Sequence, residues 1–185
     1  MLKKKMIVAI AMILSVTVSF AQDRYFTKTG RINFFSKAAL EDIEAKNKTV
    51  QAVIDSKSGA IQFAAQMKGF EFEKQMMQQH FNENYVESDK YPKGEFKGTI
   101  TNNSGIDYTK DGSYNAKVKG KLTIHGITKD IETSGTVKVT GGKLDVNSSF
   151  TILLSDYNIS IPSVVKDKIS NSIRITVDCT LEQLK

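Results

Sequence analysis

Apolar and polar residues alternate with a period of two along most of this chain. In the segment 173–181 the odd positions hold Ile, Ile, Val, Cys and Leu, and the even positions hold polar residues. Successive side chains of a β-strand point to opposite faces, so this period predicts strands with one buried face. About eight segments share the pattern: residues 32–34, 50–54, 61–67, 96–100, 116–124, 131–139, 144–154 and 173–181.

Short turn signals separate most of these segments, such as Asn102-Asn103-Ser104-Gly105 and Gly141-Gly142. Tight turns connect antiparallel neighbours. Closure into a barrel removes the exposed edges of such a sheet, whereas a two-sheet sandwich only limits them. The sequence therefore favours one mainly β domain, built as an antiparallel barrel.

Two segments break the period. Residues 71–85 place Met77, Phe81 and Tyr85 at positions i, i+4 and i+8, which predicts a short amphipathic helix. Residues 156–171 form a long connection that contains apolar residues, and long connections of this kind are often functional lids or binding loops.

The first residues have the composition of a secretory signal peptide. Three lysines at 3–5 precede an apolar run at 6–18, which is shorter than the roughly 20 residues of a spanning helix. Ser19 and Ala21 are the small residues that a signal peptidase recognises, so we expect a signal peptide at residues 1–21 and a barrel domain at 22–185. An uncleaved anchor is the alternative. The expected localisation is exported, periplasmic or secreted, with no stable insertion in the membrane after cleavage.

Charge and cysteine content exclude several function classes. The net charge of +6 includes the three leader lysines, which leaves 23 basic against 20 acidic residues, or +3, beyond residue 21. The remaining basic residues are scattered, whereas nucleic-acid-binding surfaces cluster them, so no nucleic-acid partner is expected. Cys179 is the single cysteine and follows the apolar face of its segment, which predicts a buried thiol and no internal disulfide.

No catalytic or metal-binding motif is recognisable. A P-loop, a dinucleotide fingerprint and a Gly-x-Ser-x-Gly elbow are all missing from the sequence. His125 precedes Gly126 and has the character of a turn residue, and His80 is expected to be half-buried on the helix. We therefore predict a protein that is not an enzyme and that has no catalytic residues, no metal site and no cofactor.

Apolar side chains and small inward-facing residues point to binding instead. An eight-stranded barrel either fills its interior or holds one small ligand. Inward alanines and glycines, such as Ala65, Gly98 and Gly120, leave room for a ligand or permit strands to bend. The residues expected to line or cap a tunnel are large and apolar: Phe63, Met67, Phe70, Met76, Met77, Phe81, Phe96, Leu122, Phe150 and Ile161.

Several motifs resemble those of one family. Residues 120–129 (GKLTIHGITK) are similar to the G-x-L-T-x-x-G-V-T-K hairpin of the YceI-like family, and Tyr91-Pro92 with Phe96 resembles its yP-x-x-x-F motif. Residues 150–159 resemble its F-x-I-x-R-S-D-F-G-I segment, with Leu154 where arginine is common, and residues 164–177 resemble its ending. The Arg-Asp pair that family members usually carry before yP is missing from the segment 74–81.

The resemblance implies an antiparallel eight-stranded lipocalin-like barrel with one short helix capping an end. It also implies a tunnel for a polyisoprenoid or fatty-acyl lipid, with transport, storage or sequestration in the periplasm as the role. The alternative is a filled-core barrel that acts as an exported interaction or stress-related module. Ligand identity and oligomeric state, monomer or homodimer, stay open at this point.

Overall fold

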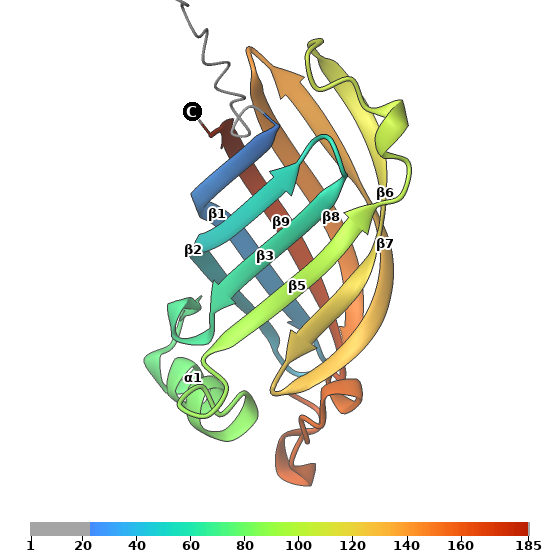
Figure 1. Ribbon diagram of the computed structural model, residues 1–185. Coiled ribbons are helices and arrows are strands. Elements are labelled where there is room, and N and C mark those ends of the chain that lie inside the picture. Colours follow the sequence, from blue (N-terminus) through green and yellow to red (C-terminus); the bar gives the residue numbers. More distant parts are fainter. Residues whose placement is uncertain (1–22, 185) are drawn as a thin grey trace, which may run out of the picture.

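Strand β1 (Arg24–Lys37) pairs with a different strand on each side, and these two pairings close the sheet. The structure is a computed structural model that describes residues 23–184 (Figure 1). The expected signal peptide at 1–21 lies outside the described residues. Seven further long strands complete the barrel: β2 (Asp42–Asp55), β3 (Ala60–Gln66), β5 (Lys93–Ile100), β6 (Gly112–Ile124), β7 (Ile127–Thr140), β8 (Lys143–Leu153) and β9 (Ser172–Gln183).

The strands follow one another around the barrel in the order β1-β9-β8-β7-β6-β5-β3-β2, and β2 pairs back to β1. All pairings are antiparallel, and the β6–β7 hairpin is continuous from Gly112 opposite Val139 to Ile124 opposite Ile127. His125 turns this hairpin with φ of 51°. The prediction of a closed, antiparallel, eight-stranded barrel is confirmed, as is the prediction of a turn at His125.

The predicted helix is present but shorter than 71–85. Glu71–Phe72 form the short strand β4, which pairs with Lys46 and Ala45 of β2. The helix α1 spans Gln75–His80, and Phe81–Tyr85 continue it as a single π-helical turn. The prediction was wrong for residues 71–74: residues 71 and 72 pair with β2, which competes with the weak helical preference of so short a segment, and residues 73 and 74 form a bend.

Two clusters of apolar side chains fill the barrel unequally. One cluster lies toward the end where β1 begins and β9 ends, and it contains Ile54, Leu144 and Leu181, all nearly inaccessible to solvent. The second lies toward the end that carries α1 and the connection from β8 to β9, and it contains Met67, Phe70 and Tyr157. Figure 1 shows α1 and that connection at the same end of the barrel.

Two of the inward glycines serve close approach rather than open space. Gly98 and Gly120 face each other across β5 and β6. A Cβ atom added at Gly120 would lie 2.5 Å from the carbonyl oxygen of Lys97 and 2.6 Å from Cζ of Phe96. The Phe96 ring therefore lies over this glycine pair, and glycine is required because any side chain would collide with backbone.

Burial determines the chemistry of Cys179. The thiol is 1% exposed, and burial raises its pKa to about 11. Because the folded-state pKa lies above the unfolded value, this group favours the folded state below the unfolded pKa of about 8.5, and the contribution is lost as the pH rises toward 11.

We therefore predict that Cys179 does not react with a disulfide reagent at pH 8 unless the protein unfolds. The measurement is thiol titration with and without urea, compared with an exposed control cysteine introduced by Ser113→Cys. Equal rates for Cys179 in native and denaturing buffer would contradict the burial.

Candidate ligand-binding site

Two adjoining cavities lie inside the barrel. The outer one is at the end that carries α1, and the inner one is deeper, where Ile54, Ile61 and Val177 of the first apolar cluster also border it. The inner cavity has a volume of about 140 Å³, and the outer cavity has a volume of about 470 Å³. Five residues border both of them: Ile32, Met67, Phe70, Ile124 and Ile175. The two cavities therefore adjoin across these apolar side chains, one at the α1 end and the other deeper in the barrel.

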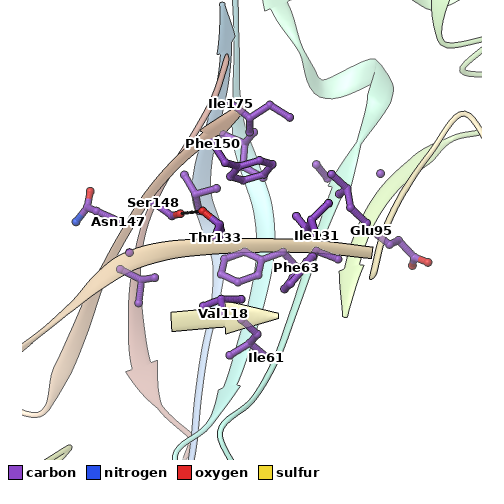
Figure 2. Close-up of a pocket in the computed structure, with 18 of the residues that line it drawn as sticks. Ile61, Phe63, Glu95, Val118, Ile131, Thr133, Asn147, Ser148, Phe150 and Ile175 are labelled. Carbon is purple, nitrogen blue, oxygen red and sulfur yellow. Dashed lines mark hydrogen bonds between the residues drawn. The ribbon is translucent and has the colours of Figure 1, made fainter. Parts of the chain in front are cut away.

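The inner cavity presents an apolar surface. Phe63, Ile131 and Phe150 come from three different strands and surround the space (Figure 2). The amide of Asn147 and the carboxylate of Glu95 are turned away from these side chains (Figure 2). Ser148 Oγ donates a hydrogen bond of 2.8 Å to the carbonyl oxygen of Ser134 and lies 3.4 Å from Thr133 Oγ1. An apolar ligand would leave none of these polar groups without a partner.

Small residues create much of this space. Ala65, Gly94 and Ala116 line the inner cavity together with Gly135 and Ser148. A Cβ atom at Gly94 would lie 2.5 Å from the terminal methyl group of Met67, so that flexible side chain fills the space above the glycine. The small inward residues thus divide. Gly98, Gly120 and Gly135 permit close approach of the backbone, Gly94 leaves room for Met67, and Ala65, Ala116 and Ser148 border the cavity.

An aromatic cluster holds the helical segment against the outer cavity. The Phe81 ring lies 5.5 Å from Phe34, 5.7 Å from Phe70 and 5.1 Å from Phe72, measured between ring centroids. Aromatic pairs at these separations add to the free energy gained by burial. Phe81 follows α1 directly, so the cluster positions the helix at the mouth of the barrel.

His125 links the two segments that flank this end of the barrel. Its Nε2 lies 2.6 Å from Glu87 Oε2, and its Nδ1 lies 3.0 Å from the carbonyl oxygen of Tyr157. The hydrogen bond from His125 holds the pKa of Glu87 below its ordinary value. Tyr91 stacks edge-on against the imidazole, with ring centroids 4.8 Å apart. This histidine therefore connects the β6–β7 turn to both loops.

The structure brings nine of the ten sequence-predicted residues to these cavities. Phe63, Phe96, Leu122 and Phe150 border the inner one, Met76, Met77 and Phe81 border the outer one, and Met67 and Phe70 border both. Ile161 borders neither cavity. Met76 is 68% exposed, and His80, expected to be half-buried, is exposed at the rim of the outer cavity. The role of the ten sequence-predicted residues in ligand binding stays a prediction.

Sequence reasoning missed part of the lining. Ile173 and Ile175 line the cavities from β9, and the alternation of that strand already placed them on its inner face. The charged residues Glu41, Lys74 and Lys168 line the outer cavity from three separate segments, and no sequence motif connects them.

Two further features are missing from residues 23–184: a group of metal-binding side chains and a helix able to span a membrane. No group of three or more histidine, cysteine or acidic side chains is arranged there to hold a metal ion. No helix in that range has the length and apolar character needed to cross a membrane.

Comparison with known proteins places the chain among related sequences and folds. The family model of the YceI-like domain matches residues 15–181. No curated protein sequence matches the chain significantly. Among solved structures, a polyisoprenoid-binding domain from Saccharophagus degradans, implicated in plant cell wall breakdown, has a TM-score of 0.77 at 14% identity and covers 88% of this chain and 99% of its own.

Two further structures share the fold. BcnA from Burkholderia cenocepacia has a TM-score of 0.67 at 18% identity, over 83% of this chain and 96% of its own. The YceI protein of Campylobacter jejuni has a TM-score of 0.56 at 19% identity, over 75% of this chain and 84% of its own. At these identities the likeness is one of fold.

Filling the inner cavity tests whether it is open. We predict that Ala65→Leu changes the free energy of unfolding by less than about 1 kcal/mol, because the added carbons enter empty apolar space. Gly120→Ala is the contrasting variant and should lose about 1–3 kcal/mol, because its methyl group collides with backbone. Urea unfolding measures both. A loss of several kcal/mol for Ala65→Leu would show a filled core.

Proposed function

The chain belongs to the YceI-like family, and on that premise we propose that it binds a long apolar ligand without catalysing a reaction. The ligand would be a polyisoprenoid or fatty-acyl lipid whose chain lies in the inner and outer cavities. One observation carries the proposal: two adjoining apolar cavities share five wall residues and continue from the α1 end into the barrel.

The physical basis is desolvation of the ligand chain. Each methylene group that leaves water for an apolar site gains about 0.8 kcal/mol. The polar groups at the inner wall are either hydrogen-bonded or turned away, so the chain displaces no water that the protein needs. The polyisoprenoid-binding character of the Saccharophagus degradans domain supports the same ligand class for this chain.

The role would be transport, storage or sequestration of the lipid after export. The composition of residues 1–21 supports this part of the proposal, since basic residues precede a short apolar run. A filled-core interaction module is the weaker candidate, because cavities of about 140 Å³ and 470 Å³ remain beside the filled cluster.

Lipid uptake tests the binding function with a matched pair of variants. We predict that protein purified from cells carries an apolar adduct in native mass spectrometry, and that refolded protein takes up a labelled polyisoprenoid alcohol or fatty acid. Ala65→Phe should lower the affinity by tenfold or more, because its ring occupies the inner cavity.

Ala64→Phe is the control, because Ala64 is adjacent to Ala65 on β3 but its side chain points to the opposite face of the sheet. It should bind like the unchanged protein. Refolded wild-type protein that takes up neither ligand would refute the proposed function.

Export has its own test. We predict that protein expressed with its first residues intact is recovered outside the cytoplasm with a mass that begins at Gln22. Intact-mass measurement of each cell fraction decides this. Replacing the three lysines at 3–5 with glutamate should leave uncleaved precursor, because the basic region is part of the signal. If the unchanged protein and the glutamate variant are both found at full length in the cytoplasm, the proposed localisation is contradicted.

A further inference from the structure

The mouth of the outer cavity carries charges that a purely apolar ligand does not require. Three charged residues line it: Glu41 from the turn between β1 and β2, Lys74 just before α1, and Lys168 from the connection between β8 and β9. We call these three residues the charged rim. The rest of the wall of this cavity is predominantly aliphatic and aromatic.

Contacts between the three segments hold the charged rim in place. Lys74 Nζ donates a hydrogen bond of 2.8 Å to Glu41 Oε1, which ties the β1–β2 turn to the start of α1. The backbone N–H of Leu40 donates a hydrogen bond of 2.9 Å to the carbonyl oxygen of Asp167, which ties the same turn to the segment that carries Lys168. The charges are therefore positioned by tertiary contacts on both sides.

The three residues of the charged rim carry two positive charges and one negative charge, and the negative charge of Glu73 also acts on Lys74. The hydrogen bond from Lys74, together with the charges of Lys74 and Lys168, holds the pKa of Glu41 below its ordinary value, so this carboxylate is ionised at neutral pH. Glu41 pairs directly with Lys74. Within residues 23–184, Lys168 makes no ion pair shorter than 4.0 Å and acts on Glu41 through its charge alone.

The apolar walls of the two cavities restrict where the polar head group of a ligand can lie. A charged or strongly polar group moved into the inner cavity would lose its hydration without gaining a partner, because the polar groups of that wall are satisfied or turned away. At the rim the same group stays partly hydrated and meets cations. An amphipathic ligand thus enters with its chain inward and its head at the charged rim.

We propose that the charged rim binds the acidic head group, a carboxylate or a phosphate, of a lipid whose chain lies in the two cavities. Lys168 supplies the unpaired positive charge. Lys74 also contributes a positive charge, which it shares with Glu41. This inference rests on the proposed lipid-binding function and adds the chemical class of the ligand. It also assigns the ligand an orientation.

The test compares three ligands with the same chain: hexadecanoic acid, hexadecyl phosphate and hexadecan-1-ol. Each displaces the neutral dye N-phenyl-1-naphthylamine from delipidated protein at pH 8. Lys168→Gln and Lys74→Gln should weaken both acids by about twofold to fivefold, the range of solvent-exposed ion pairs, and leave the alcohol unchanged. Glu41→Gln should strengthen both acids, because it removes a competing carboxylate.

The matched control is Lys138→Gln, an exposed lysine of β7 that borders neither cavity. It should leave all three affinities unchanged. Raising the salt concentration from 0.02 M to 0.5 M should weaken the acids but not the alcohol. A larger loss for the phosphate than for the carboxylate in the lysine variants would identify phosphate as the preferred head group, and the reverse would identify carboxylate.

Two results would overturn the inference, and they differ from failure of the proposed function. If all three ligands bind and the lysine variants change acid and alcohol affinities equally, the rim does not recognise the acidic head. If the acids bind without any salt dependence, the same conclusion follows. If none of the three ligands binds to the unchanged protein, the lipid-binding function itself is refuted.

Discussion

Closure of the sheet through β1 is the constraint on which the rest of the structure depends. Every strand in the barrel has two neighbours because β1 bonds both β2 and β9. Closure therefore removes the two outer edges that an open sheet would expose, although β7 pairs with β8 only over Gly135–Thr140. Closure also fixes the width of the interior, since strand number sets the diameter of a barrel. The register of β1 shifts near Gly30, where a Cβ atom would lie 2.5 Å from the Sγ of Cys179. Gly30 therefore lies where the closing strand β1 contacts the buried Cys179 side chain.

The interior is packed unevenly because side chains of different size line different parts of it. Toward the end where β1 begins and β9 ends, Ile54, Leu144 and Leu181 meet across the barrel and exclude solvent. Deeper in the barrel, Ala65 and Ala116 border the inner cavity, and large side chains such as Phe63 and Phe150 stand around it. The filled cluster and the inner cavity thus lie side by side in one barrel, and Ile54 belongs to both.

The comparisons show how much sequence difference this fold accommodates. Solved structures at 14–19% identity keep the fold over 75–88% of this chain, so the barrel tolerates wide changes of sequence. Such tolerance is expected when alternation and volume, rather than particular residues, specify a core. The segment before Tyr91 is where this chain departs from the usual family pattern. There α1, the Phe81 cluster and Lys74 form one side of the outer cavity.

The sequence by itself determined the local elements, and the tertiary structure decided what they enclose. Period-two alternation predicted eight antiparallel strands, the inward Cys179 and the turn at His125, because each depends on neighbours close in the chain. The β4 pairing of Glu71 and Phe72 was not predictable, since its partner lies some 26 residues away on β2. The distinction between Gly120, which lies against backbone, and Ala65, which borders open volume, required the inter-strand register. The charged rim likewise joins residues 41, 74 and 168, which only barrel closure and two loop contacts bring to one mouth.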